Sequence, residues 1–222
     1  LVNISQISTD YSCSPLMKQV DVNKILYAHP KIKEDFTIRD VPEDLLVPTG
    51  IPVSQKFVTK IPKEEARAQL GLSVTDKLIF MMSGSMGHGD LFDLAAKVIK
   101  DSPENTKLLV VTGNNKKVYN EFNRRFKNNS KLIVIGYTDK IALYLDACDV
   151  FMTKPGGLSS TEALVKEVPI VHLDISHNNI NEKQEKALEV LFSGEGEILD
   201  RCQKALEINN TCFEAYFLLS YN

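Results

Sequence analysis

The sequence predicts an α/β protein built around a Rossmann-like, doubly wound parallel sheet. Three observations support this: continuous apolar runs alternate with amphipathic segments, glycine-rich loops follow two of the runs, and the composition is globular. Of the 222 residues, 43% are hydrophobic and 25% are charged, which is enough to form a buried core. Strands that are covered on both faces of a parallel sheet appear as continuous apolar runs of this kind.

Bulk composition excludes several classes of partner. The net charge of -3 and the pI of about 5.9 give no field that would attract nucleic acid. The longest apolar runs, such as 107–112, are far shorter than the ~20 residues that span a bilayer. No basic and then apolar leader opens the chain, and Cys13, Cys148, Cys202 and Cys212 have no metal-ligand spacing. We therefore expect a cytoplasmic protein that binds no metal, cofactor or nucleic acid.

Residues 1–58 form the first of three expected regions. Short apolar pieces at 4–7, 24–28 and 45–47 are separated by turn residues, and a charged stretch at 30–40 suits a short helix. The segment 48–52 contains two prolines and a glycine, a composition typical of a stiff turn or an interdomain hinge.

Residues 59–180 form the second region, in which strands and helices alternate. The hydrophobic pattern predicts strands at 77–82, 108–111, 132–135, 150–153 and 169–173, and helices at 90–100, 116–126, 141–147 and 159–166. In the first of these helices, Leu91, Leu94, Ala95 and Val98 recur at helical spacing. Strict alternation of this kind predicts a parallel sheet with helices on both faces.

Residues 181–222 lose the strand signals and are expected to be helical. The pattern over 196–219 resembles a tetratricopeptide unit, which cannot bury its apolar face alone and would need a neighbour or a protein partner. The alternative is a C-terminal pair of helices that packs back on the Rossmann-like domain.

The loop Ser83–Gly89 follows an expected strand and precedes a helix. Its small residues let backbone N–H groups approach a phosphate, and the following helix adds the positive end of its dipole. The spacing matches neither the dinucleotide fingerprint nor the P-loop. A plain tight turn is the alternative, and His88 is either a phosphate donor or simply solvated.

The second glycine loop, in the segment 154–162, joins the strand at 150–153 to the next helix. Ser159 or Ser160 is expected to cap that helix, with a pyrophosphate over its first N–H groups. Glu162, one turn inside, can accept both hydroxyls of a ribose. The alternative is a capping box from Ser159 to Glu162 without any ligand. Two such loops on one parallel sheet favour the ligand, because these sheets bind ligands outside their carboxyl ends.

Residues 152–164, MTKPGGLSSTEAL, resemble the signature of glycosyltransferase family 28. The resemblance is to its lipid-modifying members, the monogalactosyldiacylglycerol synthases and the processive diacylglycerol glucosyltransferases. Further pieces agree in order and spacing, at 8–11, 48–53, 67–72, 83–89, 111–114, 135–137 and 147–150. The similarity covers about residues 4–173.

The resemblance implies the donor half of a GT-B fold and an inverting, metal-independent transfer of a hexose from a UDP-sugar to a lipid such as diacylglycerol. The glycine loops would hold the pyrophosphate, the backbone at 135–137 would meet the uracil edge, and Glu162 would bind the ribose. The donor-binding residues implied are Ser83, Gly84, Ser85, Gly87, Gly89, Asn114, Gly136, Tyr137, Lys154, Gly156, Gly157, Ser159 and Glu162. Such an enzyme would lie peripherally on the inner face of a membrane.

The chain departs from the family pattern in two places. Relatives carry a complete N-terminal domain that supplies the acceptor pocket and the base, whereas only its last portion is expected here. Asp10 and His29 are candidate groups, but no catalytic residue is assigned, and the chain alone is expected to be inactive. After the last strand, one of Asn181, Glu182 and Gln184 is expected in place of the usual sugar contacts. The alternatives are a non-catalytic interaction module that uses the C-terminal helices, and a nucleotide-sugar epimerase of the same fold.

Overall fold

The structure, a computed structural model, describes residues 3–14, 17, 21–82 and 90–173. The strands are β1 Ser5–Ile7, β2 Lys24–Tyr27, β3 Leu46–Pro48, β4 Lys77–Met82, β5 Thr106–Val111, β6 Leu132–Ile135, β7 Val150–Thr153 and β8 Ile170–His172. The helices are α1 Lys33–Thr37, α2 Gln55–Val58, α3 Lys63–Leu70, α4 Asp90–Asp101, α5 Lys116–Arg125, α6 Ile141–Ala147 and α7 Gly157–Val165.

A five-stranded parallel sheet in the order β6-β5-β4-β7-β8 confirms the predicted α/β class. The chain moves outward from β4 through β5 to β6, and then crosses to the other side of β4 for β7 and β8. The strand order therefore reverses between β4 and β7, whose last residues Met82 and Thr153 are register partners. A doubly wound sheet binds its ligands beside such a switch point.

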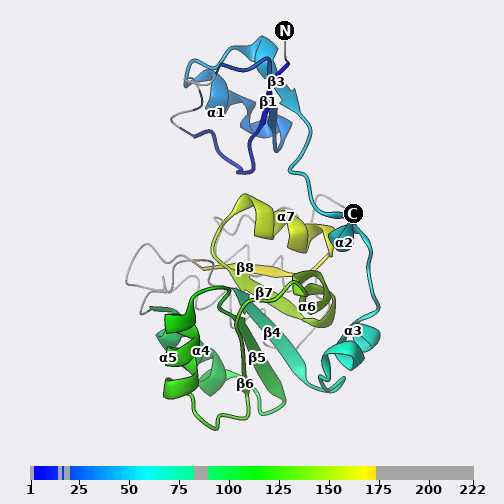
Figure 1. Ribbon diagram of the computed structural model, residues 1–222, viewed down its shortest axis with the longest axis vertical. Coiled ribbons are helices and arrows are strands. Elements are labelled where there is room, and N and C mark those ends of the chain that lie inside the picture. Colours follow the sequence, from blue (N-terminus) through cyan, green and yellow to red (C-terminus); the bar gives the residue numbers. More distant parts are fainter. Residues whose placement is uncertain (1–2, 15–16, 18–20, 83–89, 174–222) are drawn as a thin grey trace.

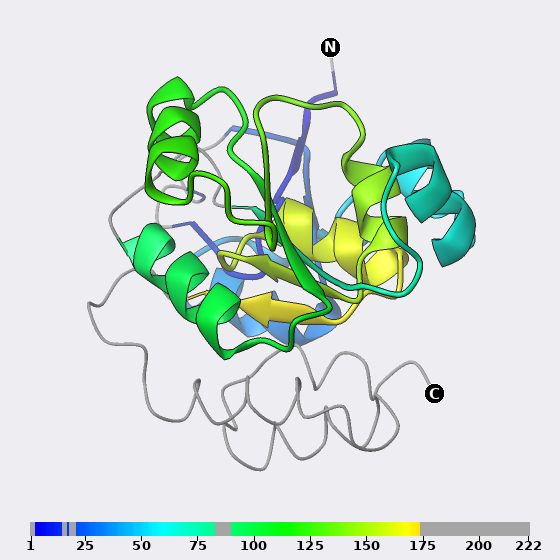
Figure 2. The ribbon, with the colours of Figure 1, turned by 90° about the horizontal axis from the view of Figure 1, so that it is seen from below.

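Alternating side chains of β4 supply the two halves of the core. Leu78 and Phe80 pack with residues of α3, α6 and α7, whereas Ile79 and Met81 pack with residues of α4 and α5. Figure 2 shows the two sets of helices on opposite sides of the sheet. Because both faces are covered, the strand is apolar at every position from 78 to 82, as a parallel central strand requires.

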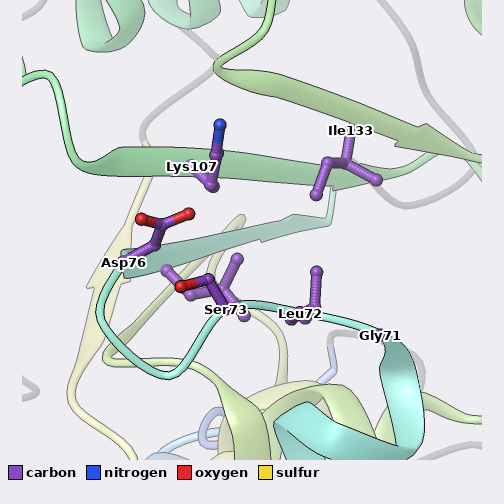
Figure 3. Close-up of a pocket in the computed structure, with 7 residues that line it drawn as sticks. Gly71, Leu72, Ser73, Asp76, Lys107 and Ile133 are labelled. Atoms are coloured by element: carbon purple, nitrogen blue, oxygen red, sulfur yellow. The ribbon is translucent and has the colours of Figure 1, made fainter.

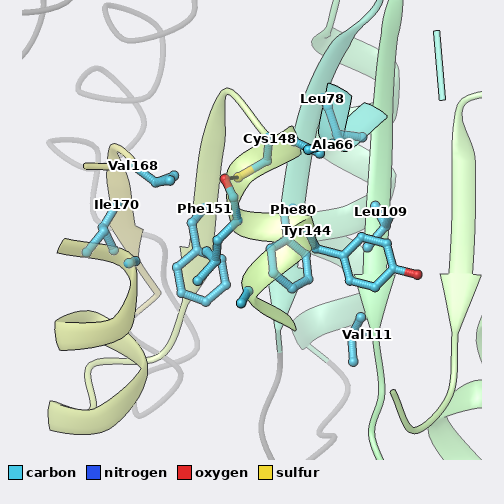
Figure 4. Packing of buried hydrophobic residues seen from close by; sticks show 14 of the residues in the cluster. Ala66, Leu78, Phe80, Leu109, Val111, Tyr144, Cys148, Phe151, Val168 and Ile170 are labelled. Carbon is cyan, nitrogen blue, oxygen red and sulfur yellow. Dashed lines mark hydrogen bonds between the residues drawn. The ribbon is translucent and has the colours of Figure 1, made fainter. Parts of the chain in front are cut away.

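Aromatic rings fill the layer between the sheet and α6 (Figure 4). The ring of Phe80 lies 5.0 Å from that of Phe151 and 5.7 Å from that of Tyr144, measured between centroids. Full burial of one such side chain contributes about 1.5–3 kcal/mol. Cys148 lies in the same layer, and burial raises the pKa of its thiol, so it is a core residue as expected.

An arginine clamp fixes the amino end of the sheet. The guanidinium of Arg67, on α3, is buried and donates to the carbonyl of Ala147 at 2.9 Å and to Asp149 Oδ2 at 2.8 Å. Asp149 Oδ2 also accepts from the amide of Leu78 at 2.7 Å, while Asp149 Oδ1 accepts from Lys63 Nζ at 2.8 Å. This clamp ties α3 to the starts of β4 and β7, the two strands that flank the switch point.

Residues 3–48, here called the N-terminal lobe, contain a separate parallel sheet in the order β1-β2-β3. Its core consists of Cys13, Met17, Ile25, Tyr27, Phe36 and Val41. The helix predicted over 30–40 is shorter and divided: a 3-10 turn at Pro30–Ile32 precedes α1. The left-handed conformation of Asp40, with φ of 60°, keeps the chain from continuing as a helix.

Residues 49–62, here called the hinge, connect the lobe to the larger domain and contain α2. Gly50 has a φ of 83°, a conformation that glycine adopts without strain. Figure 1 shows α7 between the five-stranded sheet and the N-terminal lobe. One face of α7 therefore packs on the sheet through Ala163, while the opposite face is turned toward the lobe.

Candidate functional site

The described candidate residues lie at the carboxyl edge of the five-stranded sheet. Asn114 follows β5, Gly136 and Tyr137 follow β6, and the segment 154–162 follows β7. Because β5, β6 and β7 are strands of one parallel sheet, their carboxyl ends lie along one edge. The segments that leave this edge therefore contain Asn114, Gly136, Tyr137, Lys154, Gly156, Gly157, Ser159 and Glu162. Ser83, Gly84, Ser85, Gly87, His88 and Gly89 lie outside the described residues, as do Asn181, Glu182 and Gln184.

Helix α7 begins at Gly157, two residues before the predicted start, which makes the expected serine caps wrong. Gly156 is the N-cap residue, with φ of -162° and ψ of 133°, and no side chain caps the helix. Ser159 therefore lies inside the first turn, where its hydroxyl cannot serve as the N-cap. The same finding overturns the alternative of a capping box between Ser159 and Glu162.

An uncapped first turn is suited to an anion. The first backbone bond of α7 runs from the amide of Ser160 to the carbonyl of Gly156, at 3.1 Å. The three preceding amides, at residues 157–159, belong to the set that a helix cannot satisfy internally. They lie at the positive end of the helix dipole, beside the switch point.

Gly157 must be glycine because the N-terminal lobe approaches it. A Cβ at this position would lie 1.9 Å from the carbonyl oxygen of Thr9 and 2.9 Å from Ile51 Cδ1. At Gly156, by contrast, the nearest atom to an added Cβ is the carbonyl oxygen of Lys154, at 3.9 Å. The two neighbouring glycines therefore have different roles, since only Gly157 makes room for another part of the chain.

Glu162 is half-buried on α7. Burial raises the pKa of its carboxyl above the ordinary value, and the positive charge of Lys56 opposes that shift. Lys56 belongs to α2 in the hinge, and its ammonium group also lies 5.3 Å from the centroid of the Phe57 ring. Sequence reasoning missed Lys56, because nothing in the local pattern shows that the hinge returns to α7.

Ser160 and His172 form a second polar contact that the sequence reasoning missed. The buried hydroxyl of Ser160 lies 2.8 Å from Nε2 of His172, the last residue of β8. The contact joins the first turns of α7 to the carboxyl end of the neighbouring strand. His172 ends a strand of the parallel sheet, where ligands are expected to bind, so its position in the sequence could have indicated it. Its contact with Ser160 is evident only from the three-dimensional structure.

The positions expected to meet uracil, Gly136 and Tyr137, have few close neighbours among the described residues. Among the described residues, the nearest atoms to a Cβ added at Gly136 are the carbonyl oxygen of Gly113 and Cδ2 of the Tyr119 ring, both at 3.9 Å. Tyr137 is 73% exposed and is one of the large exposed hydrophobic residues of the described chain. Among the described residues, Tyr137 is thus an exposed side chain at this edge, next to the partly exposed Gly136.

The structure separates the two candidate groups of the N-terminal lobe. Nδ1 of His29 accepts a hydrogen bond from the amide of Lys31 at 3.1 Å, so this imidazole caps a 3-10 turn. Asp10 lies between Thr9 and Tyr11 in the loop that reaches α7, and its carboxylate accepts from the amide of Tyr11 at 3.1 Å. Only Asp10 is thus brought near the candidate site.

A pocket of about 240 Å³ lies at the opposite end of the sheet (Figure 3). Its lining residues are Gly71, Leu72, Ser73, Asp76, Leu78, Lys107 and Ile133. Leu78 and Lys107 stand near the amino ends of β4 and β5, so this pocket is not the candidate site. The described residues contain no group of three metal-binding side chains. In the same ranges, no helix has the length and apolar character needed to cross a bilayer.

Comparison with known proteins identifies one family. The model of the glycosyltransferase family 28 C-terminal domain matches residues 78–210, which is more than half of the chain. The match runs past residue 180, so the boundary expected between the second and third regions stays a prediction. A processive diacylglycerol beta-glucosyltransferase of Staphylococcus carnosus is 27% identical over 208 residues, which cover 93% of this chain and 52% of that protein. The chain therefore spans about half the length of the curated relatives it matches.

Solved structures share the fold at low sequence identity. Anabaena HepE, crystallised with UDP and glucose, has a TM-score of 0.55 and 12% identity, covering 96% of this chain and 71% of the other. A glycosyltransferase of Rickettsia africae has a TM-score of 0.58 and 15% identity, covering 90% of this chain and 62% of the other. These similarities support the predicted Rossmann-like class.

Proposed function

The chain belongs to glycosyltransferase family 28 through its C-terminal domain, and on that premise we propose that it binds a UDP-sugar as the donor half of a lipid hexosyltransferase. The observation that carries the proposal is the uncapped first turn of α7 beside the switch point between β4 and β7. HepE, which has the same fold, was crystallised with UDP, and the staphylococcal relative is named as a diacylglycerol glucosyltransferase.

The proposed donor lies along the carboxyl edge of the sheet. Its diphosphate meets the amides at 157–159, which the helix cannot satisfy internally, and its uracil meets the backbone at 136–137. Glu162, five residues after the start of α7, accepts the ribose hydroxyls, and the half-buried setting of its carboxylate strengthens these bonds. The loop at 83–89, which follows β4 in the sequence, is proposed to hold the diphosphate as well.

The proposed reaction is a single displacement at the anomeric carbon. The acceptor oxygen forms the new glycosidic bond, the bond to UDP breaks, and the acceptor proton leaves to a base. Because the acceptor attacks the face opposite the leaving UDP, the anomeric configuration inverts. Negative charge develops on the departing diphosphate, where the first turn of α7 supplies oriented N–H dipoles. We propose that these dipoles perform the charge stabilisation without a metal ion.

The proposed acceptor is a lipid hydroxyl such as that of diacylglycerol. The staphylococcal relatives are about twice as long as the matched region, and their names specify diacylglycerol. We propose that the acceptor site is formed by a portion corresponding to their unmatched half, on the side of the N-terminal lobe. Such an enzyme would associate peripherally with the membrane that holds its acceptor.

Calorimetric titration of the chain with UDP tests the donor site. The wild-type chain is expected to bind saturably, and Glu162→Ala to weaken binding by about 1–3 kcal/mol, the cost of removing a partner from buried hydrogen bonds. Glu104→Ala is the matched control, because Glu104 is an exposed carboxylate that precedes β5, at the opposite edge of the sheet. Absence of UDP binding to the folded wild-type chain would refute the proposal.

A further inference from the structure

A loop of the N-terminal lobe is hydrogen-bonded to the first turns of α7. Tyr11 Oη lies 2.8 Å from Thr161 Oγ1, although the two residues are 150 positions apart in sequence. Thr161 Oγ1 in turn donates to the carbonyl of Gly157 at 2.6 Å. A hydroxyl has one proton to donate, so Thr161 acts as acceptor toward Tyr11, and the phenol is the donor.

Backbone contact next to this bond shows that the two surfaces are fitted to each other. The carbonyl oxygen of Thr9 occupies the space where a side chain at residue 157 would stand, and Ile51 of the hinge approaches the same glycine. The two residues that flank Asp10 in the loop, Thr9 and Tyr11, therefore both contact α7. Gly157 on α7 and the Tyr11–Thr161 hydroxyl pair beside it together define one orientation of the lobe relative to α7.

The other end of α7 is attached to the hinge. Lys166, the C-cap residue of α7, donates through Nζ to the carbonyl of Thr59 at 2.5 Å. The next residue, Glu167, forms an ion pair with Lys60 at 2.5 Å. The start of α7 therefore holds the lobe, and its end holds the hinge that leads to the lobe.

We propose that the Tyr11–Thr161 bond is a latch that holds the N-terminal lobe closed on the donor site, with Tyr11 as a positioning residue for the transfer. The attachment at Thr59 and Lys60 is the fixed pivot, and the left-handed Gly50 lies in the chain between pivot and lobe. Thr161 precedes Glu162 directly, so the latch closes beside the residue proposed to bind ribose. The inference rests on the proposed function for the identity of the ligand.

The latch predicts a definite dependence of UDP binding on Tyr11. Tyr11→Phe keeps the ring and removes only the donor, so the closed arrangement loses one hydrogen bond. Loss of one net hydrogen bond lowers the ratio of closed to open chain about five-fold, so the apparent dissociation constant for UDP is expected to rise by at most about that factor. Since Tyr11 acts through Thr161, the double variant Tyr11→Phe/Thr161→Val should bind UDP as Thr161→Val alone does.

Hydrogen exchange of the unliganded chain supplies an independent measurement. Tyr11→Phe is expected to accelerate amide exchange in both 5–14 and 157–161, while the midpoint of global unfolding stays near the wild-type value. Thr37→Val is the matched control, because Thr37 Oγ1 donates to Glu34 within α1 as Thr161 does within α7, but away from the lobe junction. This control should change neither readout.

The outcomes separate the latch from the proposed function. Failure of the wild-type chain to bind UDP would refute the donor site, and the exchange measurement would then decide the latch by itself. Accelerated exchange in both segments supports the latch, whereas exchange like that of the wild type in Tyr11→Phe refutes it. If UDP binds, unchanged affinity in Tyr11→Phe, or additive effects in the double variant, refutes the positioning role.

Discussion

Lys166 Nζ lies 2.6 Å from Asp146 Oδ2, and the two side chains are only 1% and 4% exposed. The pair joins the end of α7 to α6, and the same ammonium group holds the carbonyl of Thr59 in the hinge. Two buried charges with these partners are compensated, whereas either charge alone would be buried without its counterion.

Removal of one member of this pair should destabilise the chain strongly. Lys166→Met is expected to cost about 3–5 kcal/mol of unfolding free energy, because Asp146 is left as an uncompensated buried charge. Lys166→Met/Asp146→Leu should recover much of that loss. Urea unfolding measures both, with Lys33→Met in the exposed pair with Glu43 as a control expected to cost at most about 1 kcal/mol. Equal costs for Lys166→Met and Lys33→Met would contradict the buried-pair argument.

Alanine at the two neighbouring glycines should have unequal effects. Gly157→Ala places a methyl group against the carbonyl of Thr9, so the lobe must move away from α7 or the chain must bear overpacking of about 1–3 kcal/mol. Gly156→Ala has open space and an extended backbone, and its unfolding free energy should stay within about 0.5 kcal/mol of wild type. Thermal unfolding compares the two, and equal stability of both variants would show that the lobe does not rest on Gly157.

UDP affinity should depend on pH through Glu162. The carboxylate accepts the proposed ribose bonds, and its pKa is raised by burial, so affinity should fall as pH decreases through that raised value. Glu162→Gln has no such titration. Calorimetric titration at several pH values gives the ratio of the UDP affinities of the wild-type chain and Glu162→Gln. Protonation of the UDP phosphates affects both affinities equally and therefore cancels in this ratio. A ratio independent of pH would exclude an ionised Glu162 as the acceptor.

The clamp at Asp149 should make stability pH-dependent. Burial would raise the pKa of this carboxyl, but bonds from Lys63 and the amide of Leu78, with the charges of Lys63 and Arg67, lower it overall. The native state therefore binds the proton less well than the unfolded chain, so the stabilisation is present above the ordinary pKa of 3.8 and is lost as pH falls through the depressed value.

Asp149→Asn is expected to cost about 1.5–3 kcal/mol at neutral pH, the range for hydrogen bonds to charged groups. The difference from wild type should shrink at acid pH, where Asp149 itself is protonated. Unfolding by urea across pH checks this, with Glu104→Gln as an exposed control that should track the wild-type curve. A difference that persists unchanged into acid would show that charge at Asp149 does not matter.

The strands of the larger domain were predictable because each contains a continuous apolar run. The run 77–82 coincides with β4, and those at 132–135 and 150–153 coincide with β6 and β7. Both faces of these strands are covered, so a local pattern contains all the necessary information. The start of α7 was not predictable in this way: serine normally caps a helix, but extended Gly156 begins this one earlier.

The candidate site was predictable only in part. Glycine loops at strand ends indicated the carboxyl edge, and the parallel order of the sheet confirms that these loops share it. The partners of the site come from distant sequence: Tyr11 reaches Thr161, Lys56 faces Glu162, and His172 meets Ser160. No local periodicity encodes contacts between residues that are brought together only when the lobe, the hinge and the sheet are assembled.

The central position of β4 constrains the order in which a nascent chain can fold. Residues 77–135 contain β4, β5 and β6, which pair with their sequence neighbours and can form half of the sheet as they leave the ribosome. The other edge of β4 stays open until β7 has been synthesised, about seventy residues after the start of β4. Asp149, which directly precedes β7, then binds the amide of Leu78. If synthesis paused before residue 149, the unpaired edge of β4 would therefore stay exposed. Chaperones bind unpaired apolar strand edges of this kind, and such edges also promote aggregation.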